Sequence, residues 1–122
     1  MSFVEIAKKL GVSETAVRKK LQKLEELGVI RRYTVEVDPR KLGFNIIALI
    51  GLDTTPESYI RVIDALRKDD RIVKMYSSSG DHMVLIEVWF RNSEEMSQFV
   101  KKLNDMEGVT RVCPAILIER LK

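Results

Sequence analysis

Apolar side chains between residues 3 and 27 recur at helical spacing in two short runs that a glycine separates. Ser2 and Glu5 form a capping box, which predicts the start of a first helix, and Gly11 can adopt the positive φ that ends it. The second run is capped by Ser13 and places its inward side chains at i, i+4 and i+7: Val17, Leu21 and Leu24. This pattern predicts a helix-turn-helix, whose second helix lies in the DNA major groove.

The free face of the second helix is polar and basic. If the helix docks in a groove, one group of side chains is best placed near base edges: Ser13, Thr15, Arg18, Lys19 and Gln22. A second group is better placed for phosphates: Lys20, Lys23, Arg31 and Arg32. We therefore predict double-stranded DNA as a partner. The alternative is a helical hairpin whose basic face is merely solvated.

A supporting helix is missing from this motif. DNA-binding helix-turn-helix domains normally have a third helix, and two helices this short cannot bury Ile6, Leu10 and Val17 by themselves. Nothing precedes Ser2 to supply it. Either the start lies further upstream, or part of the domain was removed, or a partner chain covers the apolar face.

After Gly28, apolar and polar residues alternate through residues 29–38, which predicts a strand. Pro39 and Gly43 punctuate the exit, and the Arg40-Lys41 pair between them marks a linker. We therefore predict three parts: a helix-turn-helix module with a following strand at 1–38, a linker at 39–43, and a second domain at 44–122.

The second domain repeats the order strand, helix, strand. Strands are predicted at 44–52, 71–77, 83–90 and 109–121. Pro56 opens the first helix, Ser93 caps the second, and Gly108 ends it. The order βαββαβ is that of a ferredoxin-like sandwich, with four antiparallel strands and both helices on one face. The whole chain is therefore predicted to be α+β.

The predicted strands are apolar on both faces. Residues 44–52 are apolar on both sides of the predicted strand, as are 84–90 apart from Glu87 and 115–118. Helices cover one face, so the other would expose far more apolar surface than a monomer normally shows. We expect the sheet to pack against that of an identical subunit across a two-fold axis.

Charge and composition narrow the class of protein. Up to Lys41 there are ten basic and six acidic residues, a net charge of +4, whereas the rest sums to −1. A basic first third fits a nucleic-acid-binding module. Cys113 and His82 are the single cysteine and histidine, so neither an internal disulfide nor a four-ligand zinc site is expected. There is no signal-peptide layout and no apolar run of about 18 residues, so we expect a cytoplasmic protein without a membrane partner.

Four phrases occur in order along nearly the whole chain: EIAKKLGVSETAVRKKLQKLEELGVI, IRRYTVEVDPRKLGF, SSSGDHMVLIEV and EGVTRVCPAILIE. In these phrases the sequence resembles the Lrp/AsnC family (leucine-responsive regulatory protein / asparagine operon regulator). The resemblance implies a transcription regulator with a ferredoxin-like domain for effector binding and assembly. It also implies dimers that assemble to tetramers, octamers or higher forms, with an amino acid or related small molecule bound between dimers.

In the family, the hairpin between the second and third strands lines the effector pocket and usually reads Gly-Asp-Tyr-Asp. Here it reads Gly80-Asp81-His82-Met83, and Met83 cannot pair with an ammonium. By this resemblance the effector-binding candidates are Ser78, Ser79, Gly80, Asp81, His82 and Met83. Taken alone, Gly80-Asp81 is also what an ordinary hairpin turn requires.

The sequence thus predicts a sequence-specific, homo-oligomeric DNA-binding transcription regulator, with no cofactor beyond an amino-acid effector. The alternative is a metabolite-sensing or assembly module that has lost DNA binding with its first helix. An enzyme on the same fold is not supported, because the sequence contains no paired carboxylates, Ser-His-Asp set, glycine-rich phosphate loop or metal cluster.

Overall fold

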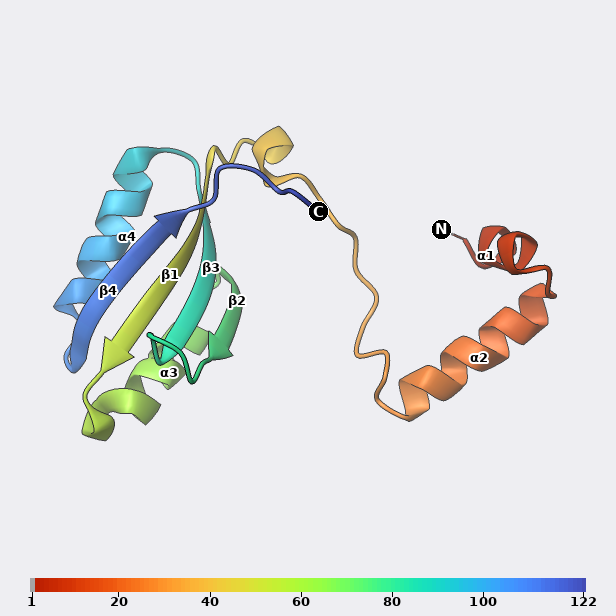
Figure 1. The fold of residues 1–122 in the computed structure, drawn as a ribbon, viewed down its shortest axis with the longest axis horizontal. Helices are drawn as coiled ribbons and strands as arrows, with labels where there is room; N and C mark the ends of the chain where they lie inside the picture. Colours follow the sequence, from red (N-terminus) through yellow and green to blue (C-terminus); the bar gives the residue numbers. More distant parts are fainter. Residues whose placement is uncertain (1) are drawn as a thin grey trace. The chain divides into compact units, whose positions relative to one another are not determined.

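The computed structural model describes residues 2–122 and contains two compact units, one extending to Val37 and one from Asp38 to Lys122. The first unit holds two α-helices, and the second holds a four-stranded sheet with two further α-helices (Figure 1). The fold is α+β, as the sequence predicts.

The first unit consists of α1 (Phe3–Leu10) and α2 (Glu14–Glu26). The Ser2 hydroxyl accepts the Glu5 backbone N–H at 3.2 Å, and the Ser13 hydroxyl accepts that of Ala16 at 3.1 Å. Gly11 ends α1 in the left-handed region, at φ 67°. The predicted caps of both helices are therefore confirmed.

These two helices bury little. Among the described residues of the first unit, only Ala7 and Val17 are buried, at the point where the helices cross. Val4 and Leu10 are 58% and 68% exposed, so the apolar face of α1 lacks a cover. The expectation that two such short helices cannot bury their apolar side chains is confirmed for Leu10, which is exposed, and is wrong for Val17, which is buried; Ile6 and Leu21 are half-buried.

The predicted strand at 29–38 is wrong. The chain forms neither helix nor strand from Ile30 to Asp38, and Val35 is 79% exposed. The alternation of side chains is present, but no other segment of the described chain pairs with this one. A strand without a partner leaves its backbone N–H and C=O groups unpaired, so side-chain period alone does not form one.

A short 3₁₀ helix, η1 (Pro39–Leu42), follows and ends at Gly43 in the left-handed region, at φ 95°. The Arg40 guanidinium donates to the carbonyl oxygens of Leu117 and Ile118, both at 3.0 Å. The start of the second unit is thereby fastened to the segment that follows its last strand.

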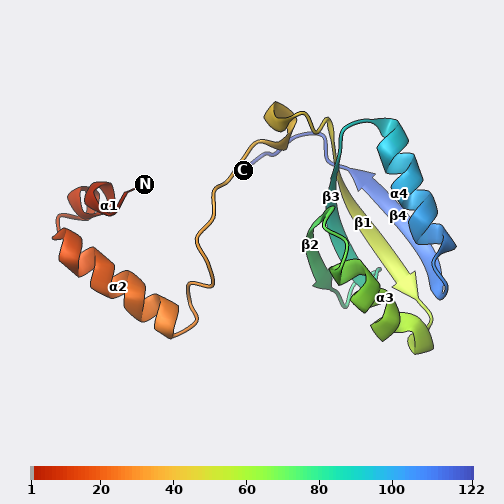
Figure 2. The ribbon, with the colours of Figure 1, turned by 180° about the vertical axis from the view of Figure 1, so that it is seen from behind.

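The second unit has the predicted βαββαβ order. Its strands are β1 (Ile46–Thr54), β2 (Ile72–Ser77), β3 (Val84–Phe90) and β4 (Val109–Ile116), and its helices are α3 (Tyr59–Arg67), preceded by the 3₁₀ turn η2 (Pro56–Ser58), and α4 (Ser93–Asp105). The strands pair antiparallel in the order β2-β3-β1-β4, and both helices lie on one face of the sheet (Figures 1 and 2). The ferredoxin-like prediction is confirmed.

The core lies between the sheet and the two helices. Alternate residues of the central strands β1 and β3 point into it and are fully buried: Ala48, Ile50, Leu52, Val84, Ile86 and Val88. The helices contribute Val62, Leu66, Phe99 and Leu103. Burying these side chains is the main favourable term for this unit.

The last strand ends sooner than predicted. The sequence predicts strand to residue 121, but β4 stops at Ile116. The Leu117 N–H still donates to the Ile47 carbonyl at 2.8 Å, and the carbonyl oxygens of Leu117 and Ile118 accept the Arg40 guanidinium. β4 lies at an edge of the sheet, as Pro114 indicated, since proline has no N–H to donate to a second neighbour.

Asp69 joins the turn after α3 to α4. Its carboxylate accepts the Arg71 backbone N–H at 3.0 Å and the guanidinium at 3.0 and 2.8 Å, and Lys102 lies 3.6 Å away. The Arg71 side chain also stacks over the Phe99 ring at 4.7 Å. The hydrogen bonds from Arg71 lower the pKa of the Asp69 carboxyl, although partial burial opposes them.

Asp69→Asn is expected to destabilise the protein by about 1–2 kcal/mol at pH 7, because the amide cannot accept from every one of these donors. The pKa is lowered in the folded state, so the stabilisation is complete above about pH 4 and is lost as the pH falls below it. Urea unfolding of both proteins from pH 7 to pH 3 measures this difference. Asp64→Asn, on the exposed side of α3, is the matched control, and a difference that grows on acidification would refute the account.

Candidate functional site

All nine side chains predicted to contact DNA are exposed. Six of them project from α2, Ser13 caps that helix, and Arg31 and Arg32 lie in the irregular segment behind it. The Ser13 hydroxyl already accepts the Ala16 N–H, so its role in the free protein is to cap α2.

The Arg18 side chain is held against its own unit. Its guanidinium donates twice to Glu14 Oε1, at 3.1 and 2.7 Å, and lies over the Phe3 ring at 4.6 Å. Gln22 likewise donates to Glu26, at 3.3 Å. The i, i+4 spacing of Glu14 and Arg18 was the sequence signal for this contact.

The lysines of α2 are the unengaged cations of this surface. Within the described residues, Lys19, Lys20 and Lys23 have no ion pair or hydrogen bond. All three are exposed on one helix. Because a groove-docking helix needs this arrangement to approach phosphates, the α2 surface is a candidate nucleic-acid interface.

The β2–β3 hairpin contains the predicted effector residues. The Ser78 backbone N–H donates to the Met83 carbonyl at 2.9 Å, and the Gly80 N–H donates to the Ser78 hydroxyl at 3.0 Å. Ser79, Gly80 and Asp81 at the tip are exposed, and Ser78 is half-buried. The tip thus presents two hydroxyls and one carboxylate.

His82 and Met83 turn away from the tip. The His82 Nδ1 lies 3.0 Å from Asp53 Oδ2, and both side chains are only 18% exposed. The Met83 side chain packs against the core, and its sulfur accepts the Thr54 N–H at 3.5 Å. Sequence reasoning missed the partner Asp53, because 29 residues separate it from His82.

Asp53 is bound by the hairpin through both carboxylate oxygens. Oδ1 accepts the Met83 backbone N–H at 3.0 Å, and Oδ2 contacts His82. The hydrogen bond from His82 lowers the pKa of the Asp53 carboxyl against the opposing effect of burial, and the Met83 N–H and the nearby Arg111 lower it further. Asp53 is therefore held as a carboxylate.

The sheet face opposite the helices carries the side chains that alternate with the core. β3 places Leu85, Glu87 and Trp89 there, each half-buried, and β1 adds Leu49. The Trp89 indole N–H donates to the Glu87 carboxylate at 2.8 Å, and its ring packs against Phe44 at 5.7 Å. No element of the second unit covers this face (Figure 1).

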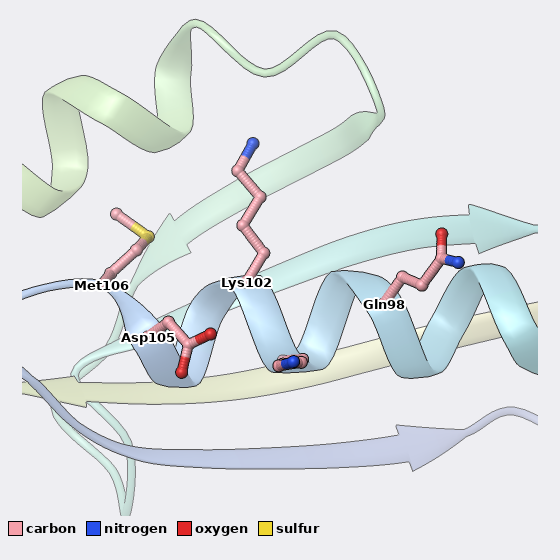
Figure 3. Close-up of a pocket in the computed structure, with 5 residues that line it drawn as sticks. Gln98, Lys102, Asp105 and Met106 are labelled. Carbon is pink, nitrogen blue, oxygen red and sulfur yellow. The ribbon is translucent and has the colours of Figure 1, made fainter.

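An open groove of about 450 Å³ runs along α4. It is lined by Gln98, Lys101, Lys102, Asp105 and Met106 (Figure 3). None of the predicted effector residues contributes to it. Among residues 2–122 no group of three or more His, Cys, Asp or Glu could hold a metal ion, and no helix there is long and apolar enough to cross a membrane.

Both parts of the chain match described families. Residues 47–122 match the Lrp/AsnC ligand binding domain, and residues 1–45 match a helix-turn-helix domain. Among solved structures, the fold is similar to *Escherichia coli* AsnC, with a TM-score of 0.83 at 20% identity over 100% of this chain and 83% of that one. It is also similar to a transcriptional regulator of *Neisseria meningitidis* in complex with L-methionine, with a TM-score of 0.88 at 19% identity over 100% of this chain and 81% of that one.

The sequence relatives are regulators as well. The chain is 46% identical over 121 residues to the HTH-type transcriptional regulator LrpA of *Pyrococcus horikoshii*, which covers 98% of this chain and 86% of that protein. It is 38% identical over 122 residues to LrpA1 of *Halobacterium salinarum*, which covers 99% of this chain and 86% of that protein. The chain belongs to the Lrp/AsnC family of transcriptional regulators.

Proposed function

We propose that this chain is a sequence-specific DNA-binding transcription regulator that works as a homo-oligomer in the cytoplasm and is modulated by an amino acid or related small molecule bound between dimers. The observation that carries the proposal is the exposed α2 surface, with its three unengaged lysines, in a helix-turn-helix. The similarity to LrpA regulators over nearly the whole chain supports it.

In this function α2 enters the major groove. Thr15, Lys19 and Gln22 face the base edges, and the remaining cations neutralise phosphates: Lys20, Lys23, Arg31 and Arg32. Arg18 reaches a base only by leaving Glu14 and Phe3. The loss of its contacts with Glu14 and Phe3 then offsets part of the free energy that Arg18 gains by contacting DNA.

Dimer formation covers the sheet face opposite the helices. Leu49, Leu85 and Trp89 lie on it, and Tyr76, which pairs with Leu85 across β2 and β3, is 55% exposed. The Glu87 carboxylate already accepts a hydrogen bond from the Trp89 indole N–H. Burying Glu87 in the dimer interface therefore leaves it partly satisfied. A second copy supplies a matching apolar face by symmetry.

The effector site we propose is the hairpin from Ser78 to Met83. Two similar structures, the *Neisseria meningitidis* regulator and a feast or famine regulatory protein of *Mycobacterium tuberculosis*, are complexes with L-methionine. In this chain Asp81 is the carboxylate at the exposed tip, and it is the group available to an effector's ammonium. Met83 is packed inward and takes no part.

The alternative of an assembly module without DNA binding is not favoured, because the similar proteins are DNA-binding-type regulators and the helix-turn-helix is present. Gel shifts of this chain and of an upstream-extended form separate the two functions. Binding by both forms supports the regulator. Binding by the extended form alone supports the assembly module for this chain.

Replacing Lys20 and Lys23 by alanine is expected to weaken binding to all DNA sequences alike and to reduce the slope of log K against log salt by about 2, because each phosphate contact releases about one counterion. Fluorescence anisotropy at several salt concentrations measures this. The matched control replaces Lys68 and Lys101, two exposed lysines of the second unit. A slope that is the same in both double variants would contradict the proposed interface.

Replacing Leu85 by arginine is expected to raise the dimer dissociation constant by about a hundredfold or more, because an unpaired charge would be buried between the sheets. Sedimentation velocity over a range of concentrations measures the constant, with urea unfolding as a check on the fold. Ile60→Arg, on the 68%-exposed outer side of α3, is the control. Equal dimerisation of the two variants would show that this sheet face is not the interface.

A further inference from the structure

Asp53 is the second-to-last residue of β1 and lies on the sheet face opposite the helices. Its two carboxylate oxygens hold the returning arm of the β2–β3 hairpin at two places, the Met83 backbone N–H and the His82 imidazole, both at 3.0 Å. Hydrogen bonds to a charged acceptor are about twice as strong as neutral ones. The end of one strand therefore determines where the hairpin lies.

The His82 imidazole packs against Gly51, in the space that a side chain at that position would fill. A Cβ at Gly51 would collide with Cδ2 and Cγ of the His82 ring, so the ring occupies the space that any larger residue would fill. Gly51 does not have a positive φ, and glycine is needed here for space and not for backbone freedom. Asp53 and Gly51 lie two residues apart on the same strand face, where one ring can contact both.

The Met83 side chain adds a third point of attachment. Its sulfur accepts the Thr54 N–H at 3.5 Å, and the rest of the side chain packs against the core. The tip residues Ser79 and Asp81 have no such attachment and remain exposed. The hairpin thus has a fixed arm and a free tip.

We propose that Asp53 is the positioning residue of the effector hairpin, and that with Gly51 and His82 it holds Ser78, Ser79 and Asp81 in the arrangement that an amino-acid ligand meets. The inference rests on the effector function proposed above. A binding loop held in its bound conformation loses less entropy when the ligand arrives, and the ligand affinity rises accordingly.

The anchor is tested first without a ligand, by amide hydrogen exchange of the intact chain. In Asp53→Ala the amides of Met83 and Ser78 are expected to exchange at least about tenfold faster, because the Met83 N–H donates to Asp53 and the Ser78 N–H donates to the Met83 carbonyl, while α4 amides are unchanged. Asp53→Asn keeps an acceptor for the Met83 N–H and is expected to restore part of the protection. Asp64→Ala on α3 is the control, and unchanged exchange in Asp53→Ala would overturn the proposal.

The packing of His82 against Gly51 is tested by a double substitution. Gly51→Ala displaces the ring without altering Asp53 or His82, and it is expected to raise hairpin exchange as Asp53→Ala does. His82→Ala removes the group with which the new methyl collides. Adding Gly51→Ala to His82→Ala is therefore expected to cost nothing further. If the effects of the two substitutions on hairpin exchange are simply additive, the His82 ring does not pack against Gly51.

The positioning role is tested with each of the twenty amino acids added singly, by thermal shift and then calorimetry. An amino acid that stabilises the wild type is expected to bind Asp53→Ala at least about tenfold more weakly and Asp64→Ala equally well. Faster exchange with unchanged affinity would overturn the positioning role. If no amino acid stabilises the wild type, the effector function fails and the role with it, and the exchange result then shows that the anchor serves the fold alone.

Discussion

The structure depends on one constraint: an antiparallel sheet that is apolar on both faces has helices for only one of them. The fully buried side chains of β1 and β3 all point toward α3 and α4, whereas Leu49, Leu85 and Trp89 on the other face remain half-buried. The apolar effect that builds the core thus also leaves an uncovered surface. The proposed assembly follows from this imbalance, because a second copy is the simplest source of a face of the same size and character.

The fold could be predicted wherever the information is local. Ser2, Gly11 and Ser13 set the helix boundaries of the first unit through contacts three or four residues away, and the βαββαβ order follows from side-chain periods. The predictions that failed are those that depend on how segments distant in the sequence pair. Residues 29–38 alternate as a strand does, yet no described segment pairs with them, and β4 ends at Ile116, after which the carbonyl oxygens of Leu117 and Ile118 accept Arg40. The alternation of apolar and polar residues shows which face of a strand a side chain lies on, but not whether a second strand pairs with it.

The candidate sites show the same division. The exposure of the α2 cations could be predicted from the helical pattern. The contacts of Arg18 with Phe3 and Glu14 could be seen only in the structure. At the hairpin, the sequence marked His82 and Met83 as departures from a family pattern without showing their use. Both side chains fasten the hairpin to β1, through Asp53 and Thr54. The His82 ring lies against Gly51, on the face opposite the helices, so the hairpin adjoins that face.

In the proposed regulator, a sheet-to-sheet dimer presents two helix-turn-helix units to one DNA duplex. Hydroxyl-radical footprinting of this chain on a bound DNA fragment tests it most directly, since the method records which sugars each unit shields. The account predicts two protected patches of the same extent, related by symmetry and separated by about 10 base pairs or a multiple of that distance. A single patch that keeps its extent at every protein concentration would contradict it.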